Sequence, residues 1–158
     1  MNKVVLITGA SSGFGHSTAK HLATKGYTVY GTSRKEITDS SIKMIKMDVC
    51  NKASITAAVD YILKQEGRID VLINNAGMGI GGCIELATDE EIDIQMNTNF
   101  RGMSNVCQCV LPVMRKQRNG KIINISSIGG VMGLPYQGYY SASKFAIEGY
   151  SEALAAEV

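Results

Sequence analysis

The sequence predicts a three-layered α/β fold, in which a doubly wound parallel sheet has helices on both faces. Three observations support this fold class. Short, continuous apolar segments recur along the 158-residue chain, longer amphipathic segments separate them, and glycine or polar residues stand at many of the joins. Strands buried on both faces are typically continuous apolar runs, and connecting helices cover both faces of a parallel sheet.

The first half of the chain alternates strands with helices. Glycine and polar residues mark the ends of the amphipathic segments, as Gly26 does after the first predicted helix. In order, the sequence predicts a strand at residues 4–7, a helix at 13–25, strands at 28–31 and 44–47, a helix at 52–65 and a strand at 71–74.

The second half continues the alternation. Thr88 and Glu91, three residues apart, form a capping box that predicts the start of a long helical region reaching about Arg118. A strand at residues 121–125 and a helix from residue 139 to the end complete the pattern. Ligands of such sheets bind at the carboxyl ends of the strands, so candidate site residues are expected there.

A glycine-rich segment follows the first strand and predicts a cradle for a dinucleotide phosphate. Residues 8–15 read T-G-A-S-S-G-F-G. Glycines at this spacing permit a tight turn, a close approach of the backbone to pyrophosphate and close packing of the next helix, whose first N–H groups face the anion. Residues 77–82 also match G-x-G-x-x-G, but no helix signal follows directly, so we interpret them as a flexible rim.

Composition excludes several classes of function. With a net charge of +2, the chain does not have the excess of basic residues that is typical of nucleic-acid-binding proteins. No apolar segment approaches the roughly 20 residues of a membrane span, and we expect a cytoplasmic protein. The cysteines and histidines indicate neither disulfides nor a metal site, and the histidines are interpreted as solvated or packing residues. These residues are Cys50, Cys83, Cys107, Cys109, His16 and His21.

A second chemical signal lies on the last predicted helix. Tyr140 and Lys144 are four residues apart, so they share one helix face. An ammonium group beside a phenol favours the phenolate form and suits a tyrosine that transfers a proton. The neighbouring Tyr136 and Tyr139 have no lysine four residues later.

Over essentially its whole length, the chain resembles the short-chain dehydrogenase/reductase family. The family's motifs occur in the family's order: T-G-x-x-x-G-x-G at residues 8–15, N-N-A-G at 74–77, a serine ending the strand before the last helix, and Y-x-x-x-K at 140–144. The resemblance implies a Rossmann-type fold and an NAD(P)-dependent oxidoreductase that acts on a hydroxyl or carbonyl group.

The resemblance also implies catalytic roles for particular residues. Tyr140 corresponds to the family's proton-transfer group, acting as general acid or base, and Lys144 to the lysine that also holds the ribose hydroxyls. Ser127 corresponds to the serine that orients the carbonyl oxygen. We choose it over Ser126 because adjacent strand residues face opposite sides and Ser127 has the family's usual distance to the tyrosine.

The family's asparagine, which helps to position a water beside the lysine, has two candidates. Asn97 and Asn99 would point about 200° apart on a regular helix. The family pattern has a glycine three residues after the asparagine, and Gly102 matches Asn99. Asn97 is then expected to be a polar residue at a helix start.

The cofactor is expected to be NADP rather than NAD. An acidic residue at the end of the second strand would bind the ribose 2′-hydroxyl of NAD, but Arg34 occupies that place and suits a 2′-phosphate. Glu36 and Asp39 lie nearby and keep NAD as the alternative. The expected cofactor-binding residues are Gly9, Ser11, Ser12, Gly13, Phe14, Gly15, Arg34, Asp48, Val49, Asn75, Ala76, Gly77, Tyr140 and Lys144.

The segments expected to rim the substrate pocket, residues 78–80 and 130–136, are apolar and uncharged. They favour a small, apolar ketone or alcohol as the substrate. Residues 133–135 and 143–149 are more similar to hydroxysteroid and retinol dehydrogenases than to fatty-acid-synthesis reductases. A 3-oxoacyl thioester, as used by those reductases, is the alternative substrate class.

The chain ends at Val158, in or near the helix that carries Tyr140, whereas family members continue with further strands. We expect residues 1–158 to form a single NAD(P)-binding Rossmann domain without those C-terminal strands, leaving residues 121–125 as an exposed sheet edge. A catalytically silent dinucleotide-binding or interaction module is the alternative function. The resemblance also implies a homodimer or homotetramer, paired through helices that correspond to about residues 99–118 and 139–158.

Overall fold

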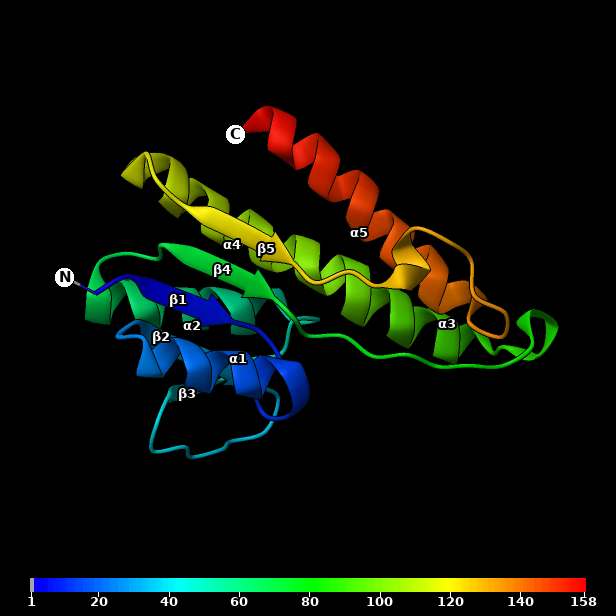
Figure 1. The fold of residues 1–158 in the computed structure, drawn as a ribbon, viewed down its shortest axis with the longest axis horizontal. Coiled ribbons are helices and arrows are strands. Elements are labelled where there is room, and N and C mark those ends of the chain that lie inside the picture. The colour runs from blue at the N-terminus through cyan, green and yellow to red at the C-terminus, as the bar shows by residue number, and fades with distance from the viewer. Residues whose placement is uncertain (1) are drawn as a thin grey trace.

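The computed structural model describes residues 2–158 and contains a five-stranded parallel sheet (Figure 1). The strand order is β3-β2-β1-β4-β5, so the chain starts in the middle of the sheet and builds outward on both sides. The strands are β1 (Val4–Ile7), β2 (Thr28–Ser33), β3 (Lys43–Lys46), β4 (Val71–Asn74) and β5 (Lys121–Asn124). Each lies within two residues of its predicted bounds.

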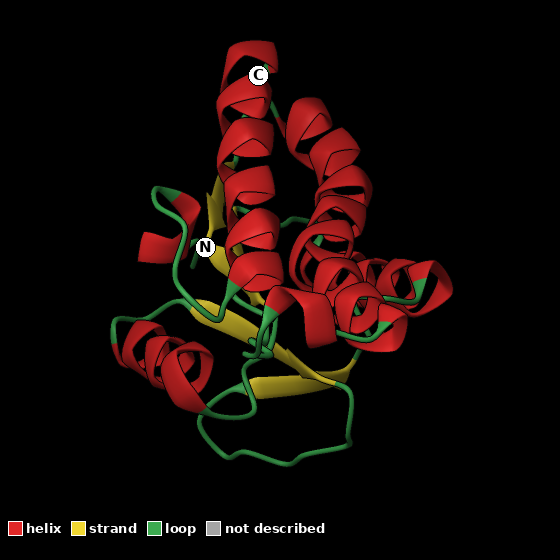
Figure 2. Ribbon diagram, turned by 90° about the vertical axis from the view of Figure 1, so that its right-hand side faces the viewer, coloured by secondary structure: helices red, strands yellow, loops and turns green. Residues whose placement is uncertain are grey.

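Helices cover both faces of this sheet (Figure 2). One face packs against α1, and the other packs against α2, α4 and α5. The helices are α1 (Gly13–Thr24), α2 (Lys52–Glu66), α3 (Asp89–Met96), α4 (Gly102–Gln117) and α5 (Gly138–Glu157). This arrangement confirms the predicted doubly wound fold. Between β2 and β3, however, a loop takes the place of a crossover helix.

Two hydrophobic cores lie on opposite faces of the sheet. Val5 and Ile7 of β1 belong to the smaller core beneath α1, while Val4 and Leu6 belong to the larger core beneath α2 and α4. Alternate residues of a strand face opposite sides, and all four are at most 2% exposed. This explains why the strand is apolar at every position.

The long helical region predicted after Thr88 is confirmed but is not regular. A π-helical turn, Asn97–Arg101, separates α3 from α4. Our interpretation of Asn97 as a residue at a helix start is therefore wrong, because the region starts at Asp89 and Asn97 lies in its middle. Such turns are rare and frequently occur at functional sites.

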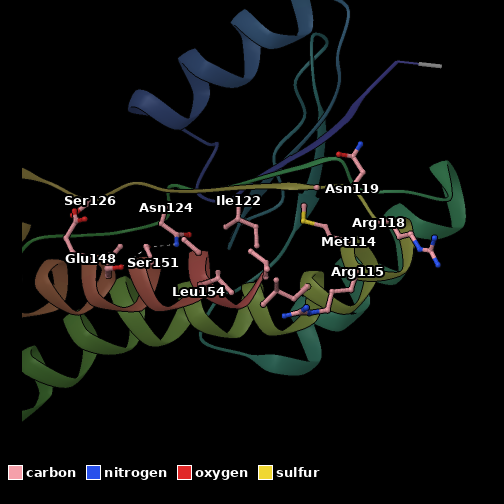
Figure 3. A pocket seen from close by; sticks show the side chains of 15 residues that line it. Met114, Arg115, Arg118, Asn119, Ile122, Asn124, Ser126, Glu148, Ser151 and Leu154 are labelled. Atoms are coloured by element: carbon pink, nitrogen blue, oxygen red, sulfur yellow. Dashed lines mark hydrogen bonds between the residues drawn. The ribbon is translucent and has the colours of Figure 1, made fainter.

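Strand β5 lies at the edge of the sheet and, within residues 2–158, pairs only with β4. The predicted exposed edge is present: Ile123 and Ile125 are 37% and 40% exposed. A cleft of about 720 Å³ opens between β5 and the C-terminal parts of α4 and α5 (Figure 3). Asn124 and Ser151 face each other there, with Asn124 Nδ2 donating to Ser151 Oγ at 2.8 Å.

Among the helices of residues 2–158, none combines the length and the hydropathy that a membrane span requires. The same residues contain no group of three or more histidine, cysteine, aspartate or glutamate side chains arranged to hold a metal ion.

Candidate functional site

The carboxyl ends of the strands border a cleft of about 1180 Å³. This is the position where ligands bind in open parallel sheets. Eleven of the expected cofactor-binding residues line the cleft: Gly9, Ser11, Ser12, Gly13, Phe14, Arg34, Asp48, Val49, Asn75, Ala76 and Gly77. Gly15, Tyr140 and Lys144, the other expected members, are not part of its lining.

The glycines of residues 8–15 divide into two roles. Gly9 has a φ of +67°, and a Cβ there would lie 2.8 Å from Ala76 Cα. A Cβ on Gly15 would lie 2.3 Å from Asn75 Nδ2. These two glycines therefore permit close packing of the turn against the end of β4.

Gly13 faces open space instead. It starts α1 with a φ of +56°, and no heavy atom lies within 4 Å of the position that its Cβ would take. The preceding N-cap residue, Ser12, makes no side-chain capping bond, so its hydroxyl does not occupy the first N–H groups of α1. An exposed helix N-terminus beside a space without side chains fits a phosphate group, and hence a dinucleotide cofactor.

Thr8 ties the end of β1 to the end of β4. Its buried Oγ1 accepts hydrogen bonds from the backbone N–H groups of Asn75 and Ala76, both at 3.0 Å. Asn75 Nδ2 returns bonds to the backbone oxygens of Thr8 and Gly9, also at 3.0 Å. Our sequence reasoning assigned Thr8 no role of its own, although it stands in the first motif.

Arg34 follows β2 directly, is exposed and lines the cleft together with Lys35. Asp39, considered above as a competing acid, does not line the cleft. Its carboxylate accepts hydrogen bonds from Ser41 and lies 2.9 Å from His16 Nε2 on α1. Hydrogen bonds from Ser41 and then His16 hold the pKa of Asp39 well below its usual range.

His16 therefore has a defined side-chain partner, which the sequence did not predict. Lys20, one turn further along α1, lies 4.0 Å from the same carboxylate oxygen. The pair His16–Asp39 joins α1 to the loop between β2 and β3, which carries Arg34 at its start. The two residues are 23 positions apart, so their pairing depends on the sheet order.

Asn99 lies in the π-helical turn and is 1% exposed. Its Oδ1 accepts from Met78 N at 2.8 Å, and its Nδ2 donates to Met78 O at 2.7 Å. The same Nδ2 donates to Ser143 Oγ at 3.0 Å. Ser143, fully buried on α5, donates in turn to the backbone oxygen of Tyr140 at 2.7 Å. These bonds connect α5 to the loop that follows β4.

Tyr140 and Lys144 lie one turn apart on α5, as predicted. Lys144 is 6% exposed. Its Nζ donates to Ile125 O at 2.9 Å and lies 5.6 Å from the centroid of the Tyr140 ring. Burial lowers the pKa of Lys144. A Cβ on Gly77 would lie 3.8 Å from Lys144 Nζ, so this pair adjoins the cleft at its Gly77 end.

The two serines after β5 face different sides. Ser127 Oγ accepts from Gly129 N at 3.1 Å, and a Cβ on Gly129 would lie 3.3 Å from Tyr140 Cε1, so the turn that Ser127 caps lies against the Tyr140 ring. Ser126 lines the cleft beside β5 (Figure 3), and its buried Oγ has no hydrogen-bond partner within the described residues. Neighbouring residues of an extended segment face opposite sides, which agrees with this arrangement.

A match to a family model described as short chain dehydrogenase covers residues 3–158. The chain belongs to the short-chain dehydrogenase/reductase family. A 3-ketodihydrosphingosine reductase of Bacteroides thetaiotaomicron is 64% identical over 99% of this chain, which spans 58% of that relative. The chain thus spans less than two thirds of this relative's length.

Other relatives and solved structures are similar at lower identity. A 3-oxoacyl-(acyl-carrier-protein) reductase of Thermotoga maritima is 39% identical, with 99% of this chain and 68% of the relative covered. Human 17-beta-hydroxysteroid dehydrogenase type 1 is 36% identical over 96% of this chain and 51% of its own. The structure of ElxO with NADP bound has a TM-score of 0.94 and 32% identity, covering 99% of this chain and 68% of that chain.

Proposed function

We propose that this chain forms the dinucleotide-binding and proton-transfer part of an NADP(H)-dependent oxidoreductase. The substrate is a carbonyl or hydroxyl compound with a long apolar chain, of the 3-ketodihydrosphingosine class. The observation that carries the proposal is the position of Tyr140 and Lys144, which adjoin the cleft at the carboxyl ends of the strands, at Gly77. The cofactor would supply hydride to the carbonyl carbon.

We assign each expected catalytic residue a role in this reaction. Tyr140 donates its proton to the carbonyl oxygen during reduction and accepts one during oxidation. Lys144, which has only Ile125 O as a hydrogen-bond partner within the described residues, holds the ribose hydroxyls and favours the phenolate. Ser127 orients the carbonyl oxygen. Asn99 holds the loop after β4 and positions a water beside Lys144.

The preference for NADP rests on the charges at the end of β2. Arg34 and Lys35 are exposed, and both line the cleft. The neighbouring Asp39 carboxylate is paired with His16 and Ser41 instead. A guanidinium group at this place suits a 2′-phosphate.

The substrate class rests on similarity and on exposed apolar side chains. The relative with 64% identity is named as a 3-ketodihydrosphingosine reductase. Val131 and Met132, in the segment expected to rim the pocket, are 65% and 54% exposed. Such side chains suit an alkyl chain better than a phosphorylated sugar. A 3-oxoacyl thioester, named for the Thermotoga maritima relative, is the second candidate.

We further propose that residues 1–158 form one NAD(P)-binding domain, because both cores pack against the same sheet. A homodimer or homotetramer and a cytoplasmic location stay predictions from the sequence.

The test measures the carbonyl-dependent oxidation of NADPH, monitored as the loss of cofactor fluorescence. The compounds tested are 3-ketodihydrosphingosine and a panel of ketones and 3-oxoacyl thioesters. Tyr140→Phe removes only the phenolic hydroxyl and should lower the rate about 100-fold or more. Tyr61→Phe, at an exposed position on α2, is the matched control and should keep the wild-type rate. Full activity of Tyr140→Phe would contradict the mechanism. NADPH binding without turnover of any compound would favour the silent binding module.

A further inference from the structure

The loop after β4 is anchored by hydrogen bonds with Asn99 and with Gln95, a side chain that the proposed chemistry does not yet use. We call residues 77–82 the anchored loop. Ile80 N donates to Gln95 Oε1 at 2.6 Å, in addition to the two bonds between Met78 and Asn99. Gly82 N donates to Tyr136 O at 2.8 Å. The sequence predicted a flexible rim here, but its backbone is bonded at three of its six residues.

Gln95 is unusual among these anchors because it is a buried polar side chain with no assigned role. It lies on α3, is 2% exposed and precedes Asn99 by four residues. Burial of an amide without hydrogen bonds is unfavourable, and its Oε1 is satisfied by the backbone of the anchored loop. Gln95 and Asn99 therefore hold Ile80 and Met78, the two residues that flank Gly79.

Gly79 connects this anchorage to the reacting tyrosine. A Cβ at Gly79 would lie 3.4 Å from Cδ2 and 3.6 Å from Cε2 of Tyr140. The backbone of the loop thus packs against the Tyr140 ring, with no side chain between them. A shift of the loop changes the space available to the ring and to a carbonyl group beside it.

We propose that Gln95 is a positioning residue, which fixes the backbone of Ile80 and thereby sets the position of the anchored loop against Tyr140. The inference rests on the proposed function of Tyr140 in proton transfer. Gln95 is not part of the lining of the cofactor cleft. The two loop residues that do line it, Gly77 and Met78, lie beside the bonds with Asn99, which a change at Gln95 leaves in place. Loss of Gln95 should affect the carbonyl reaction and not cofactor affinity.

The first variant is Gln95→Met, which keeps the side-chain length and removes the acceptor oxygen. We expect kcat/KM for the carbonyl substrate to fall about 10- to 100-fold, since a misplacement of about 1 Å has that effect on catalysis. The dissociation constant of NADPH should change less than about twofold. Gln95→Glu keeps an acceptor oxygen at the same distance and should recover most of the lost activity when the buried carboxyl is in its neutral form.

Gln117 provides a matched control. Its Oε1 accepts from Ile69 N at 3.0 Å and its Nε2 donates to Ile69 O at 2.9 Å, which is the same kind of side-chain anchorage. This bond lies just before β4, at the opposite end of that strand from the anchored loop. Gln117→Met should lower stability without changing kcat/KM. An equal loss of kcat/KM in both methionine variants would overturn the proposal.

Hydrogen exchange at the Ile80 amide tests the anchorage without any substrate or cofactor. The Ile80 amide should exchange at least about tenfold faster in Gln95→Met than in the wild type, and Gln117→Met should not change it. Unchanged exchange in Gln95→Met would overturn the proposal. Absence of turnover by the wild-type chain would contradict the proposed function alone, because the exchange measurement still decides whether Gln95 holds the loop.

Discussion

Two glycines with a positive φ allow the proposed phosphate cradle to be tested separately from stability. Gly13 starts α1 with a φ of +56°, and Gly67 ends α2 with a φ of +72°. Neither has a heavy atom within 4 Å of the position that a Cβ would take. Substitution by alanine therefore introduces no collision at either site, and its main cost is the left-handed backbone of an L-residue.

The expected loss of stability is similar for Gly13→Ala and Gly67→Ala. A left-handed alanine costs about 1–2 kcal/mol, and the reduced entropy of the unfolded chain offsets roughly half of it. A net loss of about 1 kcal/mol lowers Tm by roughly 2–4 °C for a chain of this size. Circular dichroism during heating measures this shift directly.

Cofactor affinity should distinguish the two variants. Only Gly13 lines the cleft, so only its new methyl group enters the space proposed for the pyrophosphate. We expect Gly13→Ala to weaken NADPH binding at least about tenfold, equivalent to about 1.4 kcal/mol, and Gly67→Ala to weaken it less than twofold. Fluorescence titrations at one temperature provide both values. Equal affinities in the two variants would refute the assignment of residues 8–15 as the phosphate cradle.

Three further predictions concern other positions. Arg34→Asp should weaken NADPH binding more than NADH binding in paired titrations, and an equal loss of both would contradict a role in cofactor choice. Burial raises the pKa of the Cys107 thiol to about 11 from its usual 9.0, so the unfolded chain releases this proton first and stability falls as pH rises from 9 to 11. Cys107→Ala should reduce this loss of unfolding free energy by up to about 3 kcal/mol, measured by urea unfolding at each pH. Gly102→Ala places a Cβ 2.7 Å from Val49 Cγ2 and should lower the free energy of unfolding by about 1–3 kcal/mol, measured by urea unfolding. Gly149, also on a helix, faces open space on α5, so Gly149→Ala should not destabilise the protein.

The fold class and the main features of the site were predictable from local patterns. Continuous apolar runs such as Val4–Ile7 indicate strands buried on both faces, and alternate side chains of that strand do enter different cores. The glycine spacing at residues 8–15 and the four-residue spacing of Tyr140 and Lys144 are each confined to one turn or one helix. Their geometry follows from local backbone rules, so the sequence was sufficient.

The irregular helix shows where local rules fail. Regular helical geometry would place Asn97 and Asn99 about 200° apart, and this argument assumes that no π-helical turn intervenes. Asn99 lies in the π-helical turn Asn97–Arg101. Its side chain bonds to Met78 and Ser143, which lie 21 and 44 positions away. No short-range pattern contains those partners.

The sequence by itself determined which residues are candidates for phosphate binding and proton transfer, because glycine spacing and helical periodicity act over a few residues. The tertiary structure decided which side chains hold these groups in place. Thr8 reaches Asn75 across 67 positions, His16 reaches Asp39 across 23, and Gln95 reaches Ile80 across 15. These bonds form only after strand order and helix packing bring distant segments within about 3 Å of each other, the range of a hydrogen bond.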